Sequence, residues 1–198
     1  MSEQVAKRVQ AELQTLVPIL EELTGLNSRW NGEIYLVQSA DFLGKKPFPC
    51  HIELDADLAN LDVRWRTLLH ELLHSLSAGY NQNDYNLFYG WEEGVVEQLQ
   101  RLIRLEALTR CGIIVAEEIF TSAEAGHPFN PYIAALEKIR EAINDTDARA
   151  FYVQLLNTPI KNRHASLLQS GLLTRDEGGR RIMGAVSTAR VILERRIR

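Results

Sequence analysis

Apolar residues recur along most of the chain at the spacing of helices. Within residues 3–24 they stand three and four positions apart, which is the period of an amphipathic helix, and Gly25 follows as a stop signal. The secondary structure of residues 112–122 cannot be decided from the pattern. The same period predicts further helices over residues 62–77, 91–108, 129–144, 147–157, 160–170 and 180–197. The sequence therefore predicts a mostly helical protein.

Two short segments have the composition of strands instead. EIYLVQ (33–38) and CHIEL (50–54) are rich in β-branched or aromatic residues and are bounded by turn-forming sequences. CHIEL is either an edge strand that pairs with an extended peptide or an internal strand with Ile52 and Leu54 pointing inward. The predicted fold class is α+β: a small sheet precedes the helix of residues 62–77, and the C-terminal part is helical.

Length and composition are those of an ordinary globular protein. Of the 198 residues, 45% are apolar and 24% are charged. We expect one domain, residues 1–198, with the sheet and the first long helices in 1–110, a helical subdomain in 111–198, and a hinge at GGRR (178–181). No secretory signal or membrane span is recognisable, and two cysteines are too few for a disulfide framework, so a cytoplasmic protein is expected.

Charge is distributed unevenly along the chain. Residues 161–198 contain nine Lys or Arg against three Asp or Glu, whereas residues 1–160 contain 13 against 23. A basic helix of this kind is usually a solvated face, but it could also dock onto an acidic protein partner. No recognised nucleic-acid motif is present, so a nucleic-acid partner is not favoured.

The clearest chemical signal is the sequence HELLH at residues 70–74. Positions i and i+4 of a helix lie one turn apart on the same face, so His70 and His74 can direct ring nitrogens at one metal ion. Glu71 follows the first histidine, where it can reach a water bound to that ion and act as the general base. This spacing predicts two ligands of a zinc site and a catalytic carboxylate.

A catalytic zinc site needs a third protein ligand and an open position for water. Glu93 follows His74 after 18 intervening residues, in the sequence WEEGVVEQL at the start of the next predicted helix. Glu97 lies one turn further along the same face, where it could accept a hydrogen bond from the outer ring nitrogen of a ligand histidine. We therefore predict that Zn²⁺ is bound by His70, His74 and Glu93.

These residues resemble the pattern of the gluzincin metallopeptidases of the MA clan, in which HExxH is followed by a glutamate ligand on a downstream helix. The 18-residue spacing looks most like the aminopeptidase branch, where a Trp and a Gly flank the glutamate as Trp91 and Gly94 do here. The Gly-Ala-Met-Glu-Asn exopeptidase motif is absent from the sequence. Ser77 and Tyr80 stand where the metzincins have a Gly and a third His.

The resemblance implies a zincin-like core and a hydrolase that cleaves peptide bonds, with Glu71 taking a proton from water and passing it to the leaving amine. Related enzymes also use a Tyr or His to stabilise the oxyanion. Tyr152 is the preferred candidate, on a helix some sixty residues past Glu93. The other candidates are Tyr132, Tyr85, Tyr89 and His164. Because 198 residues leave little chain for specificity subsites, the enzyme is expected to cut a dedicated protein substrate.

Other interpretations stay open. His70 and His74 could be ordinary histidines of a leucine-rich core helix. A different functional class is a non-catalytic module that binds a protein or a nucleic acid and in which the zinc site is structural or vestigial. A zinc hydrolase acting on a non-peptide bond would use the same ligands. Glu71 distinguishes an enzyme from a scaffold, because a purely structural site needs no general base.

Overall fold

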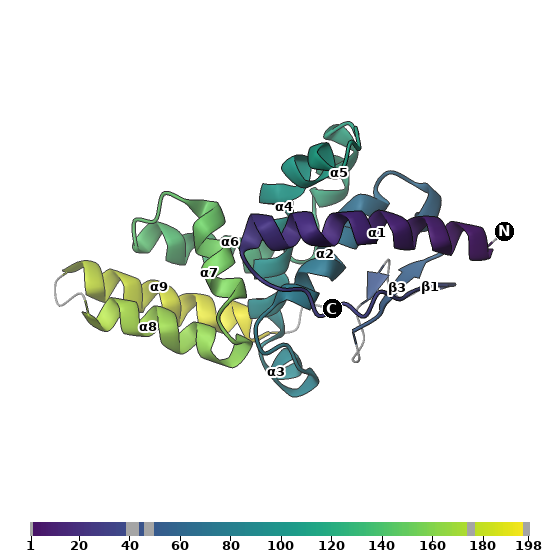
Figure 1. Ribbon diagram of the computed structural model, residues 1–198. Coiled ribbons are helices and arrows are strands. Elements are labelled where there is room, and N and C mark those ends of the chain that lie inside the picture. The colour runs from purple at the N-terminus through teal and green to yellow at the C-terminus, as the bar shows by residue number, and fades with distance from the viewer. Residues whose placement is uncertain (1, 39–43, 46–49, 174–176, 196–198) are drawn as a thin grey trace. The chain divides into compact units, whose positions relative to one another are not determined.

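The computed structural model describes residues 2–38, 44–45, 50–173 and 177–195 (Figure 1). The chain divides into two compact units, each built from two segments of the sequence. The first comprises residues 1–76 and 103–125, and the second comprises residues 77–102 and 126–198. Helix α4 (Tyr89–Arg110) contributes its first part to the second unit and its last part to the first.

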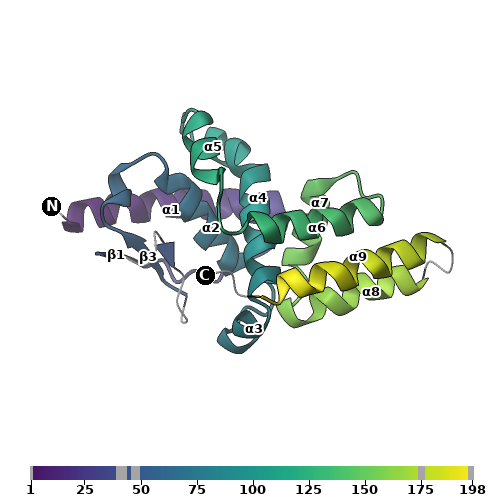
Figure 2. The same cartoon turned by 180° about the vertical axis from the view of Figure 1, so that it is seen from behind.

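The first unit combines a small sheet with helices. Its elements are α1 (Ser2–Thr24), β1 (Ile34–Val37), β2 (Gly44–Lys45), β3 (Ile52–Asp55), the 3-10 helix η1 (Leu58–Asn60), α2 (Arg64–Leu76) and α5 (Glu118–Glu124). Helix α1 contacts β1 and α2, and Figures 1 and 2 both show the strands beside its N-terminal half. Four of its apolar residues, at the predicted spacing, are almost fully buried: Val9, Leu13, Leu16 and Leu20. The predicted amphipathic helix is confirmed.

The sheet has the strand order β1-β3-β2. β1 pairs with β3 in parallel, and the two-residue strand β2 pairs with β3 in the antiparallel direction. Ile52 and Leu54 of β3 are fully buried. CHIEL is therefore an internal strand with a partner on each side, and the interpretation of it as a free edge for a peptide is wrong. Parallel strands are joined by a long connection rather than by a tight turn. The composition of the two strands therefore does not indicate which strands are neighbours in the sheet.

Helix α2 is buried along its whole length, from Arg64 to Leu76. Within the first unit it contacts α1, η1 and β2. A helix surrounded on all sides is expected to be apolar all round, yet this one carries histidines and a glutamate at buried positions. Charged or polar groups in such a place require a partner or a function, because burying them without one is costly.

Helix α5 resolves the ambiguity of residues 112–122. Arg104 of α4 donates hydrogen bonds to Glu117 and Glu124, and its guanidinium lies 4.2 Å from the centre of the Phe120 ring, which is fully buried. This short helix is therefore stabilised by its contacts with Arg104 of α4. Local periodicity alone could not identify it.

The described elements of the second unit are all helices. Its elements are α3 (Gln82–Leu87), the first part of α4, α6 (Asn130–Ala142), α7 (Ala148–Leu156), the 3-10 helix η2 (Ile160–Asn162), α8 (Arg163–Leu173) and α9 (Glu177–Leu193). Helices α8 and α9 lie side by side, and α9 also packs on α6 (Figure 2). Helix α9 begins at Glu177, so Gly178 and Gly179 are helical and the predicted hinge at 178–181 is wrong.

Two glycines let α4 pack closely in this unit. A Cβ at Gly94 would lie 2.9 Å from side-chain atoms of Tyr132 and Leu136 on α6, and one at Gly90 would lie 2.5 Å from the carbonyl oxygen of Leu193 on α9. Real Cβ atoms do not approach other atoms so closely. Gly90 and Gly94 are thus required where α6 and α9 meet the first turns of α4, on either side of Glu93.

Among the described residues, no helix is both long and apolar enough to cross a membrane. The structure is consistent with the predicted α+β class, being mostly helical with a small sheet that precedes α2. The predicted strands 33–38 and 50–54 correspond to β1 and β3. Helix α3 was not predicted, although Asn81 supplies a recognisable signal: its side chain accepts a hydrogen bond from the backbone N–H of Asp84 and so caps the helix.

Candidate metal centre

His70 and His74 lie one turn apart on α2, and both are at least nine-tenths buried. Their Nε2 atoms are 3.1 Å apart, and their rings meet edge to face. Two nitrogens bound to one zinc ion at about 2.0–2.1 Å and at the tetrahedral angle are roughly 3.3 Å apart. The two imidazoles are therefore already close to the separation that a shared metal ion requires.

The leucines of HELLH and its neighbours hold the histidines in place. Four of them are at most 1% exposed: Leu68, Leu69, Leu72 and Leu73. Packed apolar neighbours restrict the rotation of α2 and the choice of side-chain rotamers. Glu71, on the same helix, is also buried, with only 6% of its surface exposed. A carboxylate at such a position has lost most of its hydration.

Glu93 lies in the N-terminal part of α4 and is 3% exposed. Its Oε1 accepts a hydrogen bond from the hydroxyl of Tyr85, which comes from α3. Burial, the negative charge of Glu93 and the hydrogen bond itself all raise the pKa of Tyr85 above its ordinary value. The phenol therefore keeps its proton at neutral pH and acts as a donor.

His70, His74 and Glu93 form one buried group that could hold a metal ion. Each offers one ligand atom, and these atoms all lie within 4.8 Å of one another. Within the part of the chain that the structure describes, no other set of three or more His, Cys, Asp or Glu side chains is grouped in this way. Two imidazole nitrogens and one carboxylate oxygen are a donor set that suits zinc and several other divalent transition metals.

Glu97 lies one turn beyond Glu93 and is completely buried. Its Oε1 accepts hydrogen bonds from Nε and Nη2 of Arg101, at 3.0 and 2.8 Å, and lies 3.8 Å from Nδ1 of His127. Arg101 also donates to Asn130, the first residue of α6. Neither Arg101 nor His127 was predicted from the sequence as a neighbour of Glu97, and thirty positions of the chain separate His127 from Glu97.

The role first assigned to Glu97, as acceptor for a ligand histidine, stays a prediction. What the structure adds is that this carboxylate is held by Arg101, which also ties α4 to the start of α6. A buried carboxylate with a charged partner keeps a defined orientation, so Glu97 stiffens the helix that carries Glu93.

The oxyanion candidates lie in different surroundings. The hydroxyl of Tyr152, on α7, donates to Glu137 of α6 at 2.8 Å, and burial together with that carboxylate raises the pKa of Tyr152. Tyr132 donates its hydroxyl proton to the backbone carbonyl of Arg195. The ring of His164 lies 6.0 Å from that of Trp91. The assignment of Tyr152 as a catalytic residue stays a prediction.

Tyr85 is the candidate that contacts a residue of the metal group. Its ring lies 5.2 Å from that of Tyr89 and 5.6 Å from that of Tyr80, so aromatic side chains support it on two sides. The sequence places it between HELLH and Glu93, too close in the chain to match the downstream position of the donor in related enzymes. The nearby asparagine cap of α3 was the signal that could have located it.

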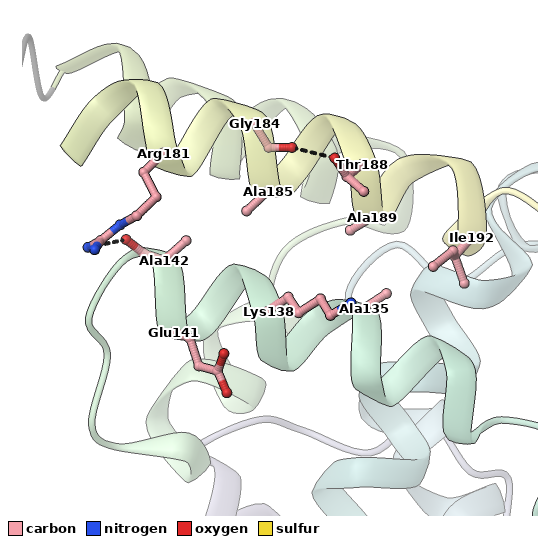
Figure 3. Close-up of a pocket in the computed structure, with 10 residues that line it drawn as sticks. All are labelled: Ala135, Lys138, Glu141, Ala142, Arg181, Gly184, Ala185, Thr188, Ala189 and Ile192. Carbon is pink, nitrogen blue, oxygen red and sulfur yellow. Dashed lines mark hydrogen bonds between the residues drawn. The ribbon is translucent and has the colours of Figure 1, made fainter. Parts of the chain in front are cut away.

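A groove lies between α6 and α9 (Figure 3). The groove encloses about 510 Å³, and its floor is built from small residues such as Ala135, Ala185 and Ala189. Arg181 closes one end by donating a hydrogen bond to the carbonyl of Ala142 at 3.1 Å. The groove follows from the small side chains that let the two helices approach each other, and it contains none of the predicted site residues.

The chain matches no protein-family model, and comparisons with curated proteins and with solved structures find no match either. A functional assignment therefore depends on the geometry of the buried group and on the residues around it.

Proposed function

We propose that this protein is a zinc-dependent peptidase of the gluzincin kind, with His70, His74 and Glu93 as the metal ligands. The observation that carries the proposal is the grouping of these three buried side chains with their ligand atoms within 4.8 Å. A core helix with chance histidines would not be expected to bring together both histidines of HExxH and a glutamate that follows them after 18 intervening residues. The order and type of the ligands match those of a catalytic rather than a closed structural zinc site.

A zinc ion held by these residues would supply a Lewis acid and would lower the pKa of a bound water to near neutrality. The chain's own contribution is the general base. Glu71 takes the proton of the attacking water and delivers it to the amine that leaves when the peptide bond breaks. Glu71 is buried and directly follows the ligand His70 on α2.

Tyr85 is our proposed donor to the oxyanion that forms on the carbonyl oxygen of the substrate. Its hydroxyl donates to Glu93, so it lies beside one of the three proposed ligands. A preorganised donor that keeps its proton is what oxyanion stabilisation requires. Tyr152, the choice from sequence, is the competing candidate, and its hydroxyl donates to Glu137, which is not a residue of the metal group.

Metal content tests the proposal most directly. Elemental mass spectrometry of tag-free protein purified without chelator should find about one zinc per chain. Glu93→Ala should lose it, whereas Glu106→Ala, an exposed glutamate further along the same helix, should keep it. Circular dichroism must show that both variants fold. A wild type that takes up no zinc even when it is supplied would refute the proposal.

The proposal includes a dedicated protein substrate. Incubation of the zinc-loaded protein with unfolded casein and, separately, with candidate partner proteins would test this part. Cleavage of one partner at a defined bond, with casein left intact, is the expected result. Broad degradation of casein would instead identify a general peptidase.

A further inference from the structure

We propose that Arg163 is a positioning residue that sets the orientation of the metal ligand Glu93 by holding its neighbour Glu92. This inference rests on the proposed metal site. Arg163 and Glu92 are both completely buried, and Nη2 of Arg163 lies 2.8 Å from Oε2 of Glu92. The pair joins the first residue of α8 to the N-terminal part of α4, across 71 positions of the sequence.

Every nitrogen of the Arg163 side chain has a defined partner. Nε donates to the backbone carbonyls of Leu155 and Thr158, at 2.7 and 3.1 Å, which fixes the guanidinium against the end of α7. Nη1 donates to the carbonyl of Trp91 at 2.8 Å, and Nη2 also donates to Oγ of Ser77 at 2.9 Å. The planar guanidinium of an arginine can donate hydrogen bonds in all these directions at the same time, whereas the single ammonium group of a lysine could not.

Ser77 completes the arrangement. Its hydroxyl accepts from Arg163 and donates to the same Oε2 of Glu92 at 2.9 Å. The next residue, Ala78, donates its backbone N–H to the carbonyl of Leu156 at 2.9 Å. The segment after α2, the end of α7 and the beginning of α4 are thus held together by Arg163, Ser77 and Glu92.

The position of Glu92 in the sequence makes this network relevant to the metal group. Consecutive residues of a helix point about 100° apart, so Glu92 and Glu93 face different directions but move as one rigid piece. A rotation or shift of the first turns of α4 that displaced Glu93 would have to break the contacts of Glu92 and of the Trp91 carbonyl. Fixing Glu92 therefore fixes the backbone from which Glu93 projects.

The energetics of buried ion pairs support a positioning role. Removing two charges from water is costly, and a well-packed apolar pair of similar volume often gives equal or greater stability. An ion pair at zero exposure is thus a poor way to gain stability but a good way to impose a single geometry. Metal affinity depends on such geometry, and loss of a residue that orients a ligand typically weakens binding by about 10- to 100-fold.

The chain offers a matched control in Arg104. Arg104 lies on α4, the helix that carries Glu92 and Glu93, and is 1% exposed. Like Arg163 it pairs with buried or half-buried glutamates, Glu117 and Glu124, at 2.6 and 2.5 Å. Arg104 lies eleven residues beyond Glu93, or roughly 16 Å along the helix axis. Its loss should reduce stability without disturbing the turn that carries the ligand.

The test compares zinc affinity with stability in the full-length chain. The double variant Arg163→Met with Glu92→Leu replaces the ion pair by an apolar pair, and Arg104→Met is the control. Zinc dissociation constants are measured by competition with a chromophoric chelator, and thermal midpoints are measured on the metal-free proteins. We expect the double variant to weaken zinc binding at least tenfold while its midpoint stays at or above that of Arg104→Met, whose zinc affinity equals that of the wild type.

The outcomes separate this inference from the proposed function. Wild-type zinc affinity in a folded double variant would overturn the inference alone, and a wild type that binds no zinc would overturn both. If the double variant does not fold, the zinc affinity of Ser77→Ala tests the inference instead. This variant removes a hydrogen bond to Glu92 and leaves the ion pair with Arg163 in place. We expect at least a threefold loss of zinc affinity in that variant, and an unchanged affinity would overturn the inference.

Discussion

The hydroxyl of Tyr85 donates a hydrogen bond to the carboxylate of Glu93. The two residues lie eight positions apart, on α3 and α4, and aromatic neighbours hold the tyrosine ring. A phenol beside a metal-ligand carboxylate can donate to a substrate oxygen without needing to ionise. This relationship separates Tyr85 from Tyr152, whose hydroxyl is bound to Glu137.

Replacement of Tyr85 by Phe should lower turnover by about 10²- to 10³-fold, the effect of removing one oxyanion donor. Zinc content should not change, because the ligands remain. Cleavage of the partner protein by the zinc-loaded variants measures this. Tyr152→Phe is the control and should retain most of the activity; if it lost activity and Tyr85→Phe did not, Tyr152 would be the donor.

Replacement of Glu71 by Gln should abolish peptide cleavage, because the amide cannot accept the proton of water, and losses of about 10²–10⁴-fold are typical for a general base. The variant should still bind one zinc per chain. Zinc content and cleavage of the same partner protein are measured on one preparation. Unchanged biological activity in this variant would favour the binding module with a structural or vestigial zinc site.

Replacement of Gly94 by Ala should lower the free energy of unfolding by about 1–3 kcal/mol, because the added methyl group meets Tyr132 and Leu136 at 2.9 Å. Gly184→Ala is the matched control, since a Cβ there meets no atom within 4 Å. Alanine favours helices over glycine, so the control should gain roughly 0.5–1 kcal/mol. Urea unfolding of the metal-free proteins tests both changes. Equal stabilities would show that α6 moves away from α4 without cost.

Stability should fall with acidification in a way that depends partly on His164. Burial and the charge of Arg190 lower the pKa of this imidazole below its ordinary value, and Glu194 acts in the opposite direction. In the unfolded chain this imidazole takes up a proton near pH 6.5, whereas in the folded protein it does so only at lower pH. Between these two pKa values the free energy of unfolding therefore decreases as the pH falls.

His164→Gln removes this contribution, so its free energy of unfolding should decline less steeply than that of the wild type between about pH 7 and pH 5.5. Urea unfolding at several pH values measures the two slopes, and the other histidines contribute equally to both proteins. Parallel slopes would mean that His164 titrates alike in the folded and unfolded states.

The sequence by itself determined the local features of this protein. The spacing of Val9, Leu13, Leu16 and Leu20 was enough to predict α1, because a helix buries residues at its own period. The separation of His70 from His74 is likewise a property of one helical turn, and their rings meet as predicted. Helix bounds were predicted to within a few residues for most of the long helices.

Contacts between distant segments were decided by the tertiary structure alone. The pairing of Arg163 with Glu92, of Arg101 with Asn130 and of Tyr152 with Glu137 depends on how helices pack, which leaves no trace in local periodicity. The same is true of the central place of β3 and of the helical start of α9 at Gly178 and Gly179. The order of apolar residues determines which face of a helix or strand is buried. Which buried polar groups become hydrogen-bonded to each other depends on how those faces pack, and that is settled only in the tertiary structure.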